Sequence, residues 1–214
     1  MGRSITIGVH GFQYDPESTN PKDDAWGELY PIWSKELGDC TEFVGFEWYS
    51  YPMDFKGFTN AWAKGCYNRY LAAWKDSEDK AAPALIKMIE EIGKPVNIIA
   101  HSLGTRVVLC AIEQSGGKLP IEKIILLSGA DTVKHANQVK YLIKAPVLNV
   151  TCEEDDVLGY LGKWFSPDLG PSATIGRNEV KGWDNIHLIN SDDHWDSYKT
   201  PSYWDMYRNF LKEK

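Results

Sequence analysis

The chain has 214 residues, of which 43% are hydrophobic, and a formal net charge of −7. A chain of this length is expected to form one domain, over residues 1–214, that buries about 70% of its unfolded surface without disulfides. The acidic balance and the lack of a basic patch argue against nucleic acids and anionic membranes as partners, so we expect a neutral or apolar small molecule as the partner.

The sequence also indicates where in the cell the protein is expected. No stretch approaches the roughly 20 consecutive apolar residues of a membrane span. A strand is expected from Ser4, which leaves no room for a signal peptide before it. The four cysteines have neither C-x-x-C nor zinc-ligand spacing, so we expect free thiols and neither a metal nor a cofactor. The sequence therefore predicts a cytoplasmic protein without a membrane span.

The first elements alternate between strand and helix. Residues Ser4 to His10 are apolar and β-branched, which predicts a strand that ends at Gly11. Glycine at this position allows the backbone to approach another group closely. Asn20-Pro21 is typical of a helix start, and that helix is expected to end at Gly38. A second strand is predicted from Thr41 to Trp48.

The segment from Tyr49 to Asp79 is unusually rich in aromatic residues. Large side chains recur every four residues at Trp62, Cys66, Tyr70 and Trp74. This spacing predicts an amphipathic helix. One interpretation is that its aromatic face packs on the domain. The other is a small cap, or a wall of an acyl-binding groove, because clefts for apolar ligands are lined by aromatic side chains.

A strand, a tight turn and a helix follow a further amphipathic helix predicted over Ala81 to Ile92. Val96 to Ala100 is an apolar run typical of a strand buried on both faces of a parallel sheet. Ala100-His101-Ser102-Leu103-Gly104 forms the turn, and Thr105 to Gln114 has helical spacing. This is the context of a G-x-S-x-G nucleophile elbow, with alanine in place of the first glycine.

The elbow predicts a role for two of its residues. Ser102 is the candidate nucleophile, because a strained turn at the top of a sheet exposes its hydroxyl. The helix that begins there directs its N–H groups at a developing oxyanion, and the N–H of Leu103 is the first such donor.

Further elements are predicted along the rest of the chain, with a long, partly irregular connection between the last two strands. They are the strands Ile121 to Leu127, Pro146 to Thr151 and Asn185 to Asn190, the helices Ala136 to Ile143 and Ser202 to Leu211, and the connection Leu161 to Trp183.

The A-H-S-L-G turn after an apolar strand, with a His-Gly pair closing the first strand, resembles the α/β-hydrolase superfamily, particularly its small lipases and esterases. The resemblance implies an α/β fold with a mostly parallel six-stranded sheet, helices on both faces, and a small helical insertion at 49–79. It also implies that the residue after the His-Gly pair, Phe12, donates the second oxyanion N–H. His10 is expected to order this loop.

The resemblance places the acid of a catalytic triad after the strand Pro146 to Thr151. In the family a small residue, two variable residues, the aspartate, one further residue and an apolar pair follow this strand. Asp155 fits that register, with Cys152 in the small position and Val157-Leu158 as the pair. Asp156 is the second candidate, and Asp131, at the end of the preceding strand, is the third.

The resemblance places the base after the last strand, where His194-Trp195 matches; His187, inside the strand, is a weaker candidate. The chain order Ser102, Asp155, His194 is that of the α/β-hydrolases. It implies a serine hydrolase that cleaves a small-molecule carboxylic ester through an acyl-enzyme. The alternatives are a thioesterase, an acyltransferase or a peptidase on the same triad, or a ligand-binding module on a hydrolase scaffold.

Overall fold

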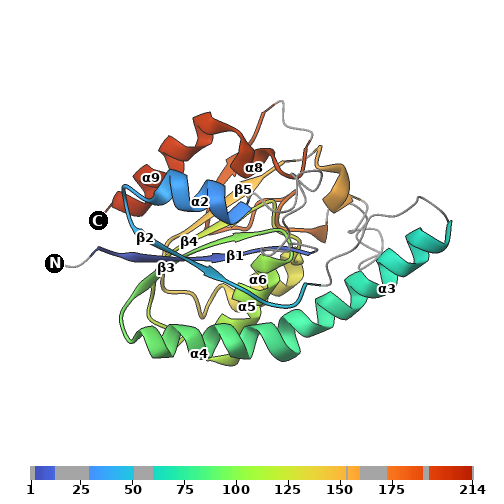
Figure 1. Ribbon diagram of the computed structural model, residues 1–214, viewed down its shortest axis with the longest axis horizontal. Coiled ribbons are helices and arrows are strands. Elements are labelled where there is room, and N and C mark those ends of the chain that lie inside the picture. Colours follow the sequence, from blue (N-terminus) through green and yellow to red (C-terminus); the bar gives the residue numbers. More distant parts are fainter. Residues whose placement is uncertain are drawn as a thin grey trace.

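A computed structural model describes residues 3–12, 29–50, 60–152, 154–159, 173–189 and 193–213. Within 60–152, the side chains are described from residue 68 onward. The described strands form a parallel six-stranded sheet in the order β2-β1-β3-β4-β5-β6 (Figure 1). The strands are β1 Ile5–Val9, β2 Glu42–Phe46, β3 Val96–His101, β4 Ile121–Leu127, β5 Val147–Thr151 and β6 Asp184–His187.

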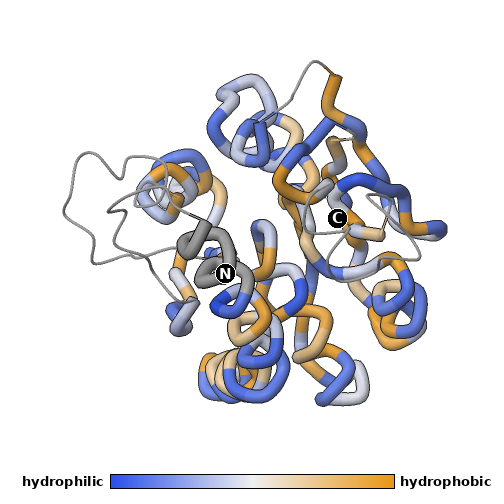
Figure 2. The backbone as a smooth tube through the Cα atoms, turned by 90° about the vertical axis from the view of Figure 1, so that its right-hand side faces the viewer, coloured by the Kyte–Doolittle hydropathy of each residue, from blue (hydrophilic) through white to orange (hydrophobic). Residues whose placement is uncertain are grey.

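Helices cover both faces of the sheet (Figure 1). One face carries α2 Leu29–Leu37, α8 Asp196–Lys199 and α9 Trp204–Lys212. The other carries α4 Ala82–Ile92, α5 Gly104–Gln114 and α6 Val133–Val139. The tube in Figure 2 alternates between apolar and polar residues along these helices, as expected of helices with one face on a core.

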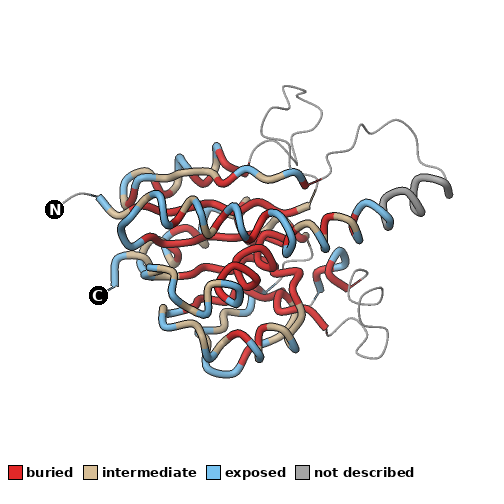
Figure 3. Tube along the Cα trace, turned by 90° about the horizontal axis from the view of Figure 1, so that it is seen from below, coloured by how far each residue is buried: buried red, intermediate tan, exposed pale blue. Residues whose placement is uncertain are grey.

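The central strands supply side chains to both apolar cores, because successive residues of a strand point to opposite faces. In β4, Ile124 and Leu126 pack in the core beneath α4 and α5, whereas Ile125 and Leu127 pack in the core beneath α2 and α9. These strands are buried along much of their length (Figure 3). Burying each such side chain stabilises the fold by roughly 1.5–3 kcal/mol.

The helices of the aromatic segment form one continuous run, where the sequence predicts two. The helix α3 Asn60–Asp76 leads through a π-helical turn, Ser77–Ala81, directly into α4. The helix α3 extends past the carboxyl ends of the strands (Figures 1 and 3). The predicted contacts of Trp62 and Cys66 lie outside the described side chains.

Two further boundaries differ from the prediction. The short helix α8, which the sequence does not predict, follows the last strand, and the final helix α9 begins at Trp204 after a 3-10 turn at Pro201–Tyr203, whereas the sequence predicts its start at Ser202. The expected helix start at Asn20-Pro21 lies outside the described residues, which enter the helix at Leu29. Within the described part of the chain, no helix has the length and apolar character needed to cross a bilayer.

Candidate active site

Ser102 lies directly after β3 in a strained backbone conformation. Its φ of 52° is in the left-handed region, which costs a non-glycine residue free energy unless the surroundings hold it there. The surroundings do so: its N–H donates to the carbonyl of Leu127 at 3.0 Å, and its carbonyl accepts from the N–H of Ala130 at 3.0 Å. The hydroxyl of Thr105 donates to the same carbonyl at 2.7 Å. The end of β4 therefore fixes the turn that carries Ser102.

Crowding explains the small residues around the elbow. A side chain at Gly104 would collide with the main-chain carbonyls of Val9 and His10, because α5 begins against the end of β1. A Cβ at Gly11 would lie 2.8 Å from the Cβ of Ser102. Ala100 is buried, so its methyl group fits where the common motif has glycine.

Asp155 and His194 form a buried pair. The Nδ1 atom of His194 lies 2.7 Å from Oδ2 of Asp155, and the two side chains are 4% and 0% exposed. The other carboxylate oxygen accepts the N–H of Leu158 at 2.9 Å. Arg177 donates from Nη1 to the main-chain carbonyl of Asp155 at 2.7 Å. A carboxylate on Nδ1 favours the tautomer with the proton there and leaves Nε2 as a proton acceptor.

The residue next to Ser102 links the elbow to His194. The Nε2 atom of His101 lies 3.1 Å from the main-chain carbonyl oxygen of His194, and the ring centroids are 4.7 Å apart. Among the described residues, no hydrogen bond joins the Ser102 hydroxyl to the His194 ring, whose Nδ1 is bonded to Asp155. Such bonds are often long in the unliganded state and tighten when substrate binds.

The two predicted oxyanion donors lie on either side of the elbow. Leu103 follows Ser102 and is the N-cap residue of α5, where the first N–H groups of a helix have no intrahelical partner. Phe12 follows Gly11, and its ring packs edge-on against Tyr70 of α3 with centroids 5.1 Å apart. The donor roles of Leu103 and Phe12 stay predictions.

His10 is buried and holds the loop between β1 and Phe12. Its Nδ1 atom lies 2.9 Å from the carbonyl oxygen of Gly11, and its Nε2 accepts the N–H of Trp48 at 3.4 Å. The Trp48 ring stacks on it at 5.5 Å. Burial lowers the pKa of His10 to about 4, so the ring is neutral near pH 7. These contacts agree with the predicted ordering role.

The alternative acids have other surroundings. Asp131 is fully buried, with Oδ1 3.4 Å from Arg106 and Oδ2 2.5 Å from Nδ1 of His135. Asp156 is exposed. Of the three candidates, Asp155 is the one that contacts His194.

The alternative base, His187, is exposed on β6 and bonds through Nδ1 to the hydroxyl of Thr151 at 3.2 Å. Sequence reasoning missed two residues that contact the Asp155 and His194 pair. Arg177 lies in a stretch without periodicity, which gave no signal. His101 stands within the elbow motif, where its place beside Ser102 was the available signal.

The aromatic helix packs against the elbow. Tyr70 and Ala73 of α3 form a buried cluster with Leu103, and Phe12, Trp48 and Trp74 pack against it. The interpretation that the aromatic face packs on the domain is therefore confirmed for the described side chains. The same cluster includes Leu103, the residue that directly follows Ser102.

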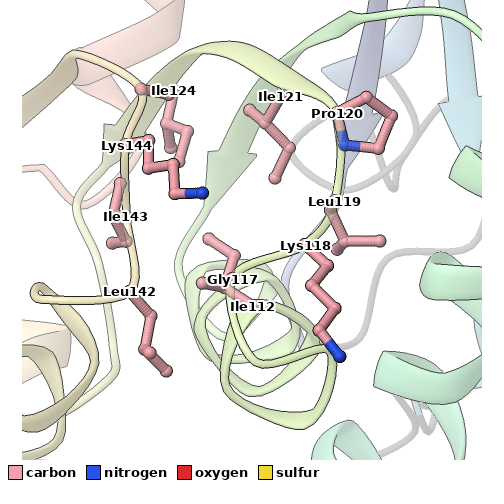
Figure 4. A pocket seen from close by; sticks show the side chains of 11 residues that line it. Ile112, Gly117, Lys118, Leu119, Pro120, Ile121, Ile124, Leu142, Ile143 and Lys144 are labelled. Carbon is pink, nitrogen blue, oxygen red and sulfur yellow. The ribbon is translucent and has the colours of Figure 1, made fainter.

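A cavity of about 170 Å³ lies elsewhere, between the turns that precede β4 and β5 (Figure 4). Its walls include Leu119, Ile121, Ile143 and the stem of Lys144. This is the amino edge of the sheet, opposite the edge that carries Ser102. Within the described residues, no group of three His, Cys, Asp or Glu side chains is arranged to hold a metal, and Cys40, Cys110 and Cys152 form no disulfide there.

Comparisons with known proteins agree with this architecture. Residues 71–151 match the family described as "Serine hydrolase", a stretch that includes the elbow and ends before Asp155. A hydrolase from Oleispira antarctica, olei00960, has a similar structure, with a TM-score of 0.59 at 12% identity, over 100% of this chain and 93% of that one. The chain has the α/β-hydrolase fold.

Two further α/β-hydrolase-like structures support the same conclusion. MenH from S. aureus gives a TM-score of 0.57 at 13% identity, covering 98% of this chain and 93% of that one. A monoacylglycerol lipase from Paleococcus ferrophilus gives 0.57 at 15% identity, covering 97% and 93%. No curated protein matches the sequence. The fold class predicted from the elbow and the strand order is confirmed.

Proposed function

We propose that this α/β-hydrolase is a serine hydrolase that cleaves carboxylic esters, with Ser102 as nucleophile, His194 as base and Asp155 as the acid that orients it. The observation that carries the proposal is the buried Asp155–His194 pair, at 2.7 Å, on the sheet edge where a strained turn presents Ser102. The match of residues 71–151 to the serine hydrolase family supports it.

The chemistry follows from these roles. Ser102 Oγ attacks the acyl carbonyl carbon while its proton passes to Nε2 of His194. The N–H groups of Leu103 and Phe12 stabilise the resulting oxyanion. The carbon–oxygen bond to the leaving alcohol then breaks, and His194 returns the proton to that oxygen. Water attacks the acyl-enzyme by the same route and releases the carboxylic acid.

The surroundings favour a neutral or apolar acyl group. Aromatic and aliphatic side chains pack beside the nucleophile: Tyr70 and Leu103 are buried, and Phe12, which packs on Tyr70, leaves part of its apolar surface exposed. Apolar ligands bind such surfaces because both lose contact with water. Thioesters and amides would use the same three residues, so substrate series must distinguish them.

The test is labelling by a fluorophosphonate, together with hydrolysis of p-nitrophenyl esters of increasing chain length. We expect wild-type protein to label and turn over, and Ser102→Ala to lose labelling and about 10⁶-fold in kcat. Ser128→Ala is the matched control, since Ser128 is also buried after a strand with a positive φ, of 45°. It should retain both activities.

Three outcomes would contradict the proposal. Labelling that survives in Ser102→Ala would assign the nucleophile elsewhere. Turnover of thioesters or peptides far above that of esters would replace the substrate class and keep the triad. Folded wild-type protein without labelling or turnover would favour the ligand-binding alternative, which equilibrium binding of an apolar ester would then measure.

A further inference from the structure

His101 occupies an unusual place beside the proposed nucleophile and base. It is the last residue of β3 and directly precedes Ser102, yet its buried side chain reaches the segment that carries His194. Its ring packs on two sides, at 4.7 Å from the ring of His194 and edge-on at 5.0 Å from Tyr198 of α8. A polar ring in such a site needs a hydrogen bond, because an unpaired buried donor is costly.

That hydrogen bond fixes the chemistry of the ring. The partner of Nε2 is the main-chain carbonyl of His194, at 3.1 Å, and a carbonyl oxygen only accepts. His101 must therefore carry its proton on Nε2. Burial, and next the positive charge that His194 can acquire, hold the pKa of His101 well below 6.5, so the ring is a neutral donor near pH 7.

The hydrogen bond from His101 restrains His194 at a second place, in addition to its contact with Asp155. Asp155 restrains the His194 side chain at Nδ1, while rotation about its side-chain bonds sets where Nε2 points. The bond from His101 to the main-chain carbonyl of His194 restrains the backbone from which that side chain extends. Since one peptide bond joins His101 to Ser102, the restraint also ties the position of His194 to that of the nucleophile. Displacement of a reacting group by about 1 Å can cost about 10²-fold in rate.

We propose that His101 is a positioning residue, which uses its hydrogen bond to the His194 carbonyl and its ring contact to hold the base in register with Ser102. This inference rests on the proposed function, because it assigns no chemistry to His101 itself. It predicts that loss of the hydrogen bond lowers kcat and leaves substrate binding unchanged.

Two variants of His101 distinguish the contribution of its hydrogen bond from that of its ring contact. His101→Phe keeps an aromatic ring and removes the donor, whereas His101→Gln keeps an N–H donor of similar reach and removes the ring. With a p-nitrophenyl ester, we expect His101→Phe to lose about 10²-fold in kcat with KM within about twofold. The fluorophosphonate labelling rate should fall in parallel. His101→Gln should retain most of the activity, and thermal unfolding should show both variants folded.

A double-mutant cycle with His194→Ala separates positioning from general damage. If His101 acts through His194, His101→Phe should have no further effect on the residual rate of His194→Ala. A full additional loss in that background would overturn the inference, and so would wild-type kcat in His101→Phe.

A measurement on the wild-type protein needs neither activity nor a stable variant. ¹⁵N NMR of histidine-labelled protein distinguishes the two neutral tautomers, and we expect the Nε2–H form for His101. The Nδ1–H form would overturn the inference, since that ring has no proton to donate to the carbonyl. The two proposals fail separately: wild-type protein without Ser102-dependent labelling refutes the function, whereas normal turnover in His101→Phe refutes only the positioning role.

Discussion

Two Asp–His pairs lie near the ends of neighbouring strands, and they differ in what surrounds them. In both, the carboxylate is fully buried and contacts Nδ1 of a histidine, at 2.7 Å in Asp155–His194 and 2.5 Å in Asp131–His135. Nε2 of His135 also lies 3.1 Å from Glu113, whereas Nε2 of His194 makes no hydrogen bond to any described residue. In the first pair the outer nitrogen, Nε2, stays available to accept a proton, whereas in the second pair both ring nitrogens have partners.

The Asp131–His135 pair also has further charged groups around it. Burial alone would lower the pKa of His135, but its bonds to Asp131 and Glu113 outweigh burial and raise it. Arg106 adds a second cation beside Asp131 and also contacts Glu78 at 2.6 Å. A raised pKa favours the protonated form of the ring, and a protonated ring cannot take a proton from a serine. The comparison shows that an Asp–His contact indicates a base only when the outer nitrogen is available.

The largest expected effect comes from replacing the carboxylate of each pair and comparing the loss of kcat. Asp155→Asn should lower kcat for ester hydrolysis by roughly 10⁴-fold, because the amide no longer fixes the His194 tautomer. Asp131→Asn should change kcat by less than about tenfold and lower the unfolding temperature instead. Asp156→Asn, at an exposed position, is the control and should alter neither quantity. Comparable losses of kcat in Asp155→Asn and Asp131→Asn would show that our distinction between the two pairs is wrong.

The next effect concerns stability. The guanidinium of Arg106 joins α5 to Asp131, to Glu78 in the π-helical turn and to the Trp74 ring, 4.2 Å away. Arg106→Met should lower the free energy of unfolding by about 3 kcal/mol, since the buried Asp131 carboxylate keeps only His135 beside it and the contacts of Arg106 to Glu78 and Trp74 are lost. Urea denaturation measures the change.

The control for that prediction is another arginine with two carboxylate partners. Arg208 contacts Glu36 and Asp205 near the surface, and its side chain is 24% exposed against 10% for Arg106. Solvent screens such pairs, so Arg208→Met should cost less than about 1 kcal/mol. Equal costs for the two variants would mean that Arg106 is not a buried anchor.

The sequence predicted the strands and the elbow because their signals are local. An apolar run, small residues around Ser102 and the register of Asp155 can all be read within a few positions. Two partners of these aspartates cannot, because Asp155 meets a histidine 39 residues away and Asp131 meets an arginine 25 residues away. The rank of Asp131 as the third candidate acid therefore relies on the resemblance, and its contact with Arg106 adds a physical argument that the sequence does not contain.

The continuous run from α3 into α4 is a second feature that the sequence does not predict, this time in the secondary structure. Residues Ser77–Ala81 contain no glycine or proline to mark a break or a change of helical type. The π-helical turn there coincides with contacts that Glu78 and Trp74 make to Arg106, a residue of another helix. Tertiary contacts of this kind leave no periodic pattern in the segment itself.

The smallest expected effect is the pH dependence of the stability that the His135 ion pairs contribute. Because the folded state raises the pKa of His135, its ion pairs contribute their full stability below the unfolded pKa of about 6.5 and lose it as pH rises through the folded value. His135→Gln should therefore lower the free energy of unfolding most near pH 6, by roughly 1.5–3 kcal/mol, and least near pH 9. The difference between wild type and variant, measured by urea denaturation at each pH, cancels other titrating groups that both proteins share. A difference that grows with pH would mean that the folded state favours the neutral form of His135, which would contradict the ion pairs inferred for it.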